Sequence, residues 1–404
     1  MGTEIMTSLL LLLVVCRVCG EFAERLGQPA MLGEIAAGVL LGPSALDVVK
    51  FSPELKGISE LGVFLLLLLA GMEIDPLEFI KGFRGRASWA PILGFFVPLA
   101  FGILVGHVFG FGATCTVFLG LCVAITALPV SVRVLMDLGK LDTPVGRTIV
   151  PTAVANDMTA FLLLGVILDF RGGGAAWGQL VLTSLLTLTK TLFFMAVMVG
   201  AYRLVRYSTG VLPASRKLLE VLVDNLKGKE TLFAVTLLFV MIFASFSEAV
   251  GFHFVIGTFF GGMLLGREIM GPERFEEVKR TASGMTMGFL APVFFASLGL
   301  QFEAGTLQDL PLVLAVLAAA FSGKILGGYW GGRLTGLSKG ESWTLGFGLN
   351  GRGVMELVIA NLGLSNGLID PKLFSILILM GVATTMVTPI LLKRSFQSLE
   401  PATA

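Results

Sequence analysis

Two adjacent polar residues, Asn156 and Asp157, interrupt an apolar run that is long enough to cross a lipid bilayer. A charged group at that depth is costly, so it is by default a functional residue. No basic residue lies within one helical turn of Asp157 in the sequence. A carboxylate without a local counter-ion can bind either a proton or a metal cation, but it cannot hold both at once. The alternative is a structural role, in which Asp157 hydrogen-bonds a neighbouring helix.

Two other apolar segments contain residues that break a helix at mid-depth. In the first, Pro129 has no N–H, so the carbonyl one turn earlier is left without its helical donor. In the second, Asn350, Gly351 and Gly353 stand in the run FGLNGRGVMELVIANLG. Interrupted helices at matching depths of two repeats are typical of the binding sites of secondary transporters.

A dehydrated monovalent cation needs several oxygen ligands. The sequence offers the Thr126 hydroxyl, the Asn156 amide oxygen and the Asp157 carboxylate, with backbone carbonyls near Thr126 and Asn350. These residue types predict a Na+ or K+ site at Asp157, with Asn156 and Thr126 as further ligands. Because Asn156 is uncharged, the simplest coupling is one proton per cation, which is electroneutral exchange.

Three further charged residues lie inside apolar segments. Lys324 is central in its segment and can pair with Asp157 across helices; the alternative is a lysine that extends to the membrane surface. Arg352 and Glu356 are four residues apart on the second broken helix, so they can pair with each other. We expect these three residues to compensate charge, with Arg352 and Glu356 acting mainly at the ends of the half-helices.

The composition excludes an ordinary soluble protein. Of the 404 residues, 55% are hydrophobic and 14% are charged, and the formal net charge is +1. Because basic and acidic residues are nearly equal in number, the protein has no overall basic surface that would attract nucleic acid. The four cysteines lie in apolar runs, where the spacing of Cys16 and Cys19 is poor evidence for a redox or metal site, and there are two histidines. The sequence indicates no cofactor.

Thirteen apolar segments are long enough to span a bilayer. They lie near residues 4–20, 29–46, 58–74, 88–108, 113–137, 147–168, 177–202, 231–249, 251–267, 283–301, 311–334, 341–363 and 372–392. Placing the N-terminus outside puts most of the 29 Lys and Arg residues in cytoplasmic loops. The sequence therefore predicts an all-α polytopic membrane protein of about thirteen helices, with the N-terminus out and the C-terminus in.

The chain also contains an internal repeat. Residues 27–42 match residues 251–266 at all four glycines, an offset of 224 positions that pairs Thr126 with Asn350. An odd number of spans between equivalent positions inverts the second copy. We therefore expect a single membrane domain over residues 1–404. Its parts are repeat one (1–170), a linking helix and cytoplasmic loop (171–230), an inverted repeat two (231–394) and a short tail (395–404).

Five motifs in this chain resemble those of the cation:proton antiporter superfamily, and most closely its second branch, the plant cation/H+ exchangers and the Kef-type membrane domains. They are LGQPAMLGEIAAGVLLGPSAL (26–46), LGVFLLLLLAGMEIDP (61–76), AITALPVSVRVLMDLGKL (124–141), VANDMTAFLLL (154–164) and LNGRGVMELVIANLGL (349–364). The resemblance covers nearly the whole chain in family order. It implies a sodium/hydrogen exchanger domain with two crossing broken helices.

By position, the resemblance makes Asn156 and Asp157 the family's ion-binding pair, puts Thr126 on the first break and matches Lys324 to a basic residue of the core. It further implies a homodimer in the cytoplasmic membrane of a prokaryote. The soluble nucleotide-binding domain of Kef-type systems is absent from the sequence, as is a glycine-rich dinucleotide fingerprint.

These observations favour a secondary antiporter that exchanges Na+ or K+ for H+ by alternating access. The alternative is a cation channel, or a uniport-like K+ efflux pathway, which would not need a titrating carboxylate. A membrane-embedded aspartyl hydrolase requires two facing carboxylates. Since Asn156 occupies the place beside Asp157, we expect no enzyme activity. The choice between Na+ and K+ depends on cavity size and ligand number, which motifs do not specify.

Overall fold

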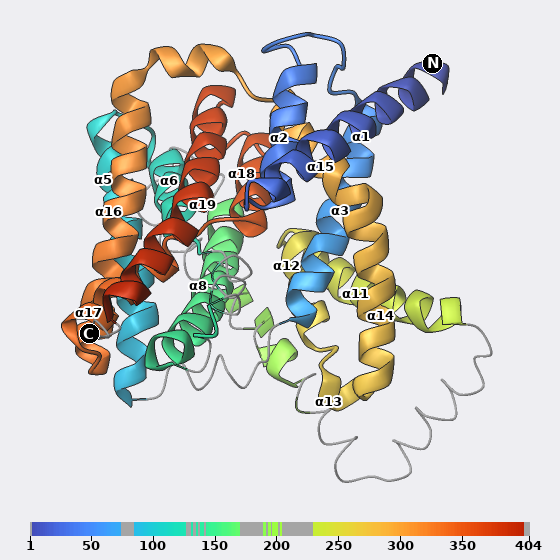
Figure 1. The fold of residues 1–404 in the computed structure, drawn as a ribbon. Coiled ribbons are helices and arrows are strands. Elements are labelled where there is room, and N and C mark those ends of the chain that lie inside the picture. Colours follow the sequence, from blue (N-terminus) through green and yellow to red (C-terminus); the bar gives the residue numbers. More distant parts are fainter. Residues whose placement is uncertain are drawn as a thin grey trace, which may run out of the picture. The chain divides into compact units, whose positions relative to one another are not determined.

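The computed structural model describes residues 2–73, 85–126, 143–169 and 229–399, with short pieces at 131, 135, 138–140, 189–190, 193–194, 196–200 and 203. All regular structure in these ranges is helical (Figure 1), which confirms the predicted all-α class. Pro129 and most of the linking segment 171–230 lie outside the described residues.

The helices of the first repeat follow its apolar segments. They are α1 (Gly2–Arg25), α2 (Ala30–Leu41), α3 (Pro53–Met72), the short 3-10 helix η1 (Gly85–Ser88), α5 (Trp89–Val108), α6 (Ala113–Ala124) and α8 (Pro144–Asp169). Helix α6 is half the length of a membrane span because it ends at the predicted break, where the backbone of Ile125 is extended.

The second repeat begins with α11 (Lys229–Val250), α12 (Phe254–Met263), α13 (Arg267–Met270), α14 (Pro272–Met285), the π-helical turn η2 (Thr286–Leu290), α15 (Ala291–Leu300) and η3 (Ala304–Gln308). It continues with α16 (Leu310–Thr335), α17 (Lys339–Leu349), α18 (Val354–Ser365) and α19 (Pro371–Leu399). Helix α19 runs into the segment expected as a tail. Helix α14 begins before the apolar segment predicted near 283, because Gly271 and Pro272 start a helix through the polar residues that precede it.

Eight helices in the described ranges are long and apolar enough to cross a membrane, and four shorter apolar helices accompany them. The shorter ones are α2, α6, α12 and α18. Two of these, α6 and α18, border the two breaks. The count of thirteen spans stays a prediction.

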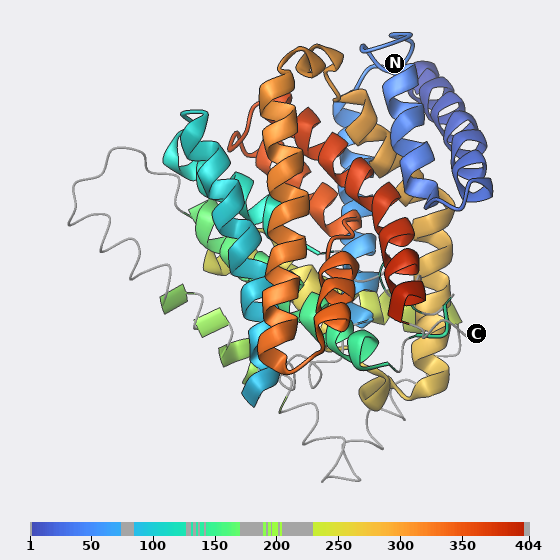
Figure 2. The same cartoon turned by 60° about the vertical axis from the view of Figure 1, so that its left-hand side comes forward.

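The chain forms two compact units, and each takes segments from both repeats. Unit one contains residues 1–56, 76–164 and 295–404, and unit two contains residues 57–75 and 165–294. In unit one, α5 lies beside α16, as both cartoon views show (Figures 1 and 2). Helix α6 packs on α5, and α17 packs on α16. Every described residue that was predicted for the site lies in unit one.

Close helix packing repeats between the two halves of the sequence. A Cβ atom at Gly33 in α2 would overlap the Cys19 carbonyl of α1, and a Cβ atom at Gly257 in α12 would overlap the Phe243 carbonyl of α11. Both residues of the second contact lie 224 positions after those of the first. The glycines shared by residues 27–42 and 251–266 therefore mark equivalent helix contacts.

The broken helices repeat with a different offset. A Cβ atom at Gly102 in α5 would lie 2.6 Å from the Gly120 Cα atom of α6, and one at Gly328 in α16 would lie 2.6 Å from the Gly346 Cα atom of α17. These contacts lie 226 positions apart. Around the break the equivalent of Thr126 is therefore Arg352, so the sequence-based pairing of Thr126 with Asn350 is wrong by two residues. Many glycines in these segments allow more than one sequence match, and the packing decides between them.

Local sequence fixes the ends of α16 and the start of α17, the half-helix that leads into the second break. The Asp309 side chain accepts a hydrogen bond from Leu312 N at the start of α16, and Gly336 ends that helix with a left-handed φ of 100°. Ser338 and Glu341 then form a capping box at the start of α17. This frame places Lys324 in the middle of α16.

Candidate ion-binding site at the crossing of the broken helices

Asn156 and Asp157 lie in the middle of α8 with side chains almost removed from solvent. Asn156 is 1% exposed and Asp157 is 3% exposed. No hydrogen-bond partner of the Asp157 Oδ1 atom is present among the described residues. The predicted pair is therefore buried, and one carboxylate oxygen is left for a ligand.

Asn156 joins α8 to the first broken helix. Its amide nitrogen donates to the Thr126 hydroxyl at 3.2 Å and to the Gly94 carbonyl oxygen at 3.5 Å. Thr126 follows the extended residue Ile125 at the end of α6. The structure therefore brings together two of the predicted ligands, Asn156 and Thr126, with the amide oxygen of Asn156 facing no donor in the described part of the chain.

The Gly94 carbonyl is available because of a proline. Pro98 lies inside α5 one turn after Gly94. A proline has no N–H, so the carbonyl four residues earlier loses its helical hydrogen bond. Pro98 was not singled out from the sequence, although the same proline chemistry that predicts a break at Pro129 was the available signal for Gly94.

Lys324 is fully buried and binds neutral oxygens. Its Nζ atom donates to the Gly94 carbonyl at 3.0 Å and to the Thr126 hydroxyl at 2.5 Å. The two charges of Lys324 and Asp157 act on each other, but the ion pairs of the described residues do not include a direct pair between them. The expected pairing across helices is therefore replaced by bonds to Gly94 and Thr126, because α5 and the first break present free acceptors. The side chain does not extend to the membrane surface.

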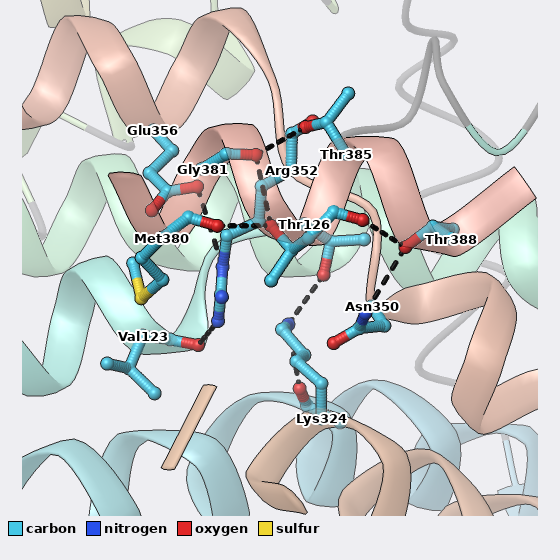
Figure 3. A network of polar contacts seen from close by, with 12 residues as sticks. Val123, Thr126, Lys324, Asn350, Arg352, Glu356, Met380, Gly381, Thr385 and Thr388 are labelled. Carbon is cyan, nitrogen blue, oxygen red and sulfur yellow. Dashed lines mark hydrogen bonds and ion pairs between the residues drawn. The ribbon is translucent and has the colours of Figure 1, made fainter. Parts of the chain in front are cut away.

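Arg352 links the second break to the first. Its Nη2 atom donates to the carbonyl of Val123 in the last turn of α6, and its Nε atom lies 3.5 Å from Glu356 Oε2 (Figure 3). Both side chains are fully buried, and the predicted pairing of Arg352 with Glu356 is confirmed. The guanidinium lies at the negative end of α6, and Glu356 lies in the first turn of α18, which is a positive end.

Ser131 makes the reciprocal contact. Its hydroxyl donates to the carbonyl of Gly348 near the end of α17. Each broken helix thus donates a hydrogen bond to the last turn of the half-helix of the other. Neither Ser131 nor Val123 was singled out from the sequence, since nothing in their type marks them.

At the second break, α17 ends at Leu349 and α18 begins at Val354. Gly353 is extended, with φ −171°. The amide nitrogen of Asn350 donates to the Thr388 hydroxyl of α19 at 3.2 Å, while its amide oxygen has no partner within the described ranges. Thr388 was missed by the sequence analysis; the signal was the run of threonines in the apolar segment GVATTMVTP.

Five buried side-chain oxygens of the site have no hydrogen-bond partner in the described ranges: Oδ1 of Asn156, Asp157 and Asn350, and the two carboxylate oxygens of Glu356, whose Oε2 faces Arg352 in an ion pair. Leaving a buried acceptor unpaired costs about 1–3 kcal/mol. Carboxylate and amide oxygens are the ligands that hard cations prefer. The described residues contain no group of three or more His, Cys, Asp or Glu side chains arranged to hold a metal ion. A cation at this site would therefore be bound by one carboxylate and neutral oxygens, as suits a transported substrate.

Known proteins share both the sequence and the fold. The profile of the transmembrane sodium/hydrogen exchanger family matches residues 9–397. The Na+/H+-K+ antiporter GerN of Bacillus cereus is 30% identical over 403 residues, covering 100% of this chain and 99% of that protein. Cation/H+ antiporter 18 of Arabidopsis thaliana is 29% identical, over 94% of this chain and 47% of the plant protein. The structure of the sodium proton antiporter MjNhaP1 from Methanocaldococcus jannaschii matches with a TM-score of 0.72 and 17% identity, over 98% of each chain.

The fold and the buried site define a polytopic α-helical membrane transporter. The chain belongs to the transmembrane sodium/hydrogen exchanger family. The resemblance inferred from the five sequence motifs is thereby confirmed, and the likeness to MjNhaP1 extends it to the fold.

Proposed function

We propose that this protein is a cation/H+ antiporter that exchanges Na+ or K+ for H+ by alternating access, with Asp157 binding the cation or the proton in competition. The observation that carries the proposal is the buried Asp157 carboxylate, whose Oδ1 has no hydrogen-bond partner in the described residues, beside Asn156. Because one carboxylate cannot hold both ions, the arrival of one releases the other.

The relatives support exchange rather than a channel. GerN is named as an antiporter of Na+, H+ and K+, and the plant relative as a cation/H+ antiporter. A channel needs oxygen-lined passage but no titrating group. The buried carboxylate at the crossing suits an exchanger, and family membership gives a transporter rather than an enzyme.

The roles of the other site residues follow from their contacts. Asn156 supplies a neutral oxygen ligand for the cation beside Asp157, and Thr126 supplies another when its hydroxyl gives up the hydrogen bond from Asn156 or Lys324. Lys324 holds the first break to α5 and offsets negative charge at the site. Arg352 offsets the negative end of α6, and Glu356 offsets the positive end of α18. With Asn156 uncharged, one proton per cation is the expected stoichiometry.

The location of the protein is inferred from its relatives and charge pattern. Bacterial relatives and apolar helices favour the cytoplasmic membrane of a prokaryote. The distribution of Lys and Arg favours an N-terminus outside and a C-terminus inside. We also expect a homodimer in the lipid bilayer.

The test is transport by purified protein in proteoliposomes that contain a pH-sensitive dye. External Na+ or K+ should drive proton efflux from the vesicles, and a clamp on the membrane potential should leave the rate unchanged. The Asp157→Asn variant should lose this exchange. Asp309→Asn is the matched control, since its carboxylate lies at the start of α16 away from the site, and it should retain exchange. Cation flux without proton movement would instead establish a channel.

A further inference from the structure

An asparagine–threonine hydrogen bond joins each break to a long helix, with the two residue types exchanged. In repeat one, Asn156 on the long helix α8 donates to Thr126 on the break at 3.2 Å. In repeat two, Asn350 on the break donates to Thr388 on the long helix α19, also at 3.2 Å. Helices α8 and α19 are the last long helices of their repeats, but the offset of 226 makes position 382, six residues before Thr388, the equivalent of Asn156.

The hydrogen bonds of Thr388 fix the orientation of the Asn350 amide. The Thr388 hydroxyl donates its one proton to the Thr384 carbonyl at 2.8 Å. Its oxygen can then only accept, so the Asn350 side chain must present its nitrogen to Thr388. The amide oxygen consequently faces the other way. Figure 3 shows this oxygen turned away from Thr388 and toward the side on which Lys324 and Thr126 lie.

The amide oxygen of Asn350 is buried and has no hydrogen-bond partner among the described residues. Asn350 is 0% exposed, and no donor for its Oδ1 atom is present among the residues that the structure describes. The bonds given for the Lys324 ammonium go to Gly94 and Thr126. An acceptor that is buried, held in one orientation and left open is suited to a ligand that arrives during the transport cycle.

We propose that Asn350 Oδ1 is a ligand of the transported cation, contributed by the second repeat and aimed by Thr388. The inference rests on the proposed function, because it assigns a further ligand to the same cation. Asn156 and Asp157 of repeat one then bind the cation from one side and Asn350 binds it from the other. The second repeat thus contributes to cation affinity through a neutral oxygen, without adding a titrating group.

The experiment compares cation affinity with maximal rate in proteoliposomes, at saturating and limiting Na+ and K+. Loss of one good oxygen ligand corresponds to about a tenfold rise in KM, so Asn350→Ala should raise KM by about that factor with a smaller change in maximal rate. Thr388→Val frees the amide to rotate and should raise KM by roughly threefold. Thr388→Ser keeps the hydroxyl and should restore the wild-type KM.

A matched threonine serves as the control. Thr258 in α12 is fully buried and its hydroxyl bonds the Phe254 carbonyl one turn earlier, as Thr388 bonds Thr384. Thr258→Val should therefore leave KM unchanged. An unchanged KM in both Asn350→Ala and Thr388→Val would overturn the proposal. So would a change confined to the pH profile at saturating cation, which would make Asn350 a positioning residue for Lys324.

A binding measurement separates this inference from the proposed exchange. A ligand that binds only the folded state raises Tm, and at a given concentration it raises Tm more the lower its Kd. NaCl or KCl, compared with choline chloride, should raise the Tm of the purified wild-type protein and raise it less in Asn350→Ala and Thr388→Val. If the wild type gains stability from the cation but moves no protons, the exchange proposal fails while the Tm shifts still decide the role of Asn350. Equal shifts in the wild type and both variants contradict the ligand assignment.

Discussion

The two broken helices share the same close glycine contacts with a long neighbouring helix, but they differ in the side chains that hydrogen-bond the opposite half-helix. In both repeats, small residues bring the half-helix against its long neighbour: Gly102 against Gly120, and Gly328 against Gly346. Repeat one donates to the opposite half-helix through Ser131, a neutral side chain, whereas repeat two donates through the charged Arg352. This difference shows that the glycine contacts determine how the half-helices pack. A few side chains determine whether a repeat presents neutral or charged groups.

The asymmetry extends to the charges. Repeat one supplies Asp157 with an open oxygen, and repeat two supplies Lys324, Arg352 and Glu356. The set contains two acidic and two basic side chains. Repeat one therefore supplies the titrating carboxylate of the site, whereas Arg352 and Glu356 of repeat two offset the ends of the half-helices.

The largest expected effect on stability distinguishes the charged contact made by Arg352 from the neutral contact made by Ser131. Arg352→Met leaves Glu356 buried without its partner, which should cost about 3–5 kcal/mol of stability, whereas Ser131→Ala removes a neutral hydrogen bond and should cost about 1 kcal/mol. Thermal unfolding, monitored by size-exclusion chromatography, measures the loss of stability in both variants. The double variant Arg352→Met with Glu356→Met should regain much of the loss. Equal losses of stability in Arg352→Met and Ser131→Ala would show that the charge of Arg352 adds nothing to the stability of its contact.

The next prediction compares equivalent glycines of the repeats. A Cβ atom at Gly38 in α2 would overlap the Ala296 carbonyl, whereas at Gly262 in α12 it would lie 2.6 Å from the Leu68 carbonyl. Overpacking of this kind costs typically about 1–3 kcal/mol. We expect Gly38→Ala to lower Tm more than Gly262→Ala does. Gly57 in α3 meets nothing within 4 Å, so Gly57→Ala is the control and should not lower Tm.

Pro98 tests whether an open carbonyl in α5 is needed for function. Pro98→Ala restores an N–H that would recapture the Gly94 carbonyl, and a proline inside a helix costs about 3 kcal/mol. The variant should therefore raise Tm, while exchange slows several-fold because Lys324 loses one of its acceptors. Pro151→Ala, in α8, should raise Tm without slowing exchange. If Pro98→Ala leaves exchange intact, Lys324 does not depend on Gly94.

The smallest effect concerns the starts of the paired long helices. Asp309 caps α16 and accepts a hydrogen bond from Lys372 at 2.5 Å, whereas Ser88 at the start of α5 makes no side-chain cap bond. The hydrogen bond from Lys372 lowers the pKa of Asp309 below its ordinary value of 3.8. Its contribution to stability is therefore present near neutral pH and is lost as pH falls through the lowered pKa.

Removing this contact should change stability slightly and leave transport alone. Asp309→Asn should lower Tm a little at pH 7, and this difference from the wild type should disappear in strong acid. Lys372→Gln should behave alike, and the double variant should lose less than the sum of the two. A change in the KM for the cation would contradict the separation of this contact from the site.

Much of the site was predictable because depth in an apolar segment is a local property. Asn156, Asp157, Lys324, Arg352 and Glu356 stand out as polar residues where the surrounding sequence is apolar. The free carbonyl of Gly94 was predictable in principle from Pro98. The partner of Lys324 was not, since Asp157, Thr126 and Gly94 are all possible acceptors and only interhelical distances choose among them.

The register of the repeat shows the same limit. Glycine matches predict an offset of 224 for α2 and α12, and the packing bears this out. At the broken helices the packing requires 226, which makes Arg352 rather than Asn350 the equivalent of Thr126. The sequence there is rich in interchangeable small residues, so that matching letters do not fix which positions meet.

The sequence by itself determined the membrane class, the duplicated halves, the two interrupted segments and the buried charges, because hydropathy, spacing and proline chemistry act over one or two helical turns. The tertiary structure decided which acceptor each charge takes and which way each amide faces. Lys324 and the Gly94 carbonyl are 230 positions apart, and Arg352 and the Val123 carbonyl are 229 apart. A hydrogen bond forms over about 3 Å, so such partners are chosen only when the helices have packed.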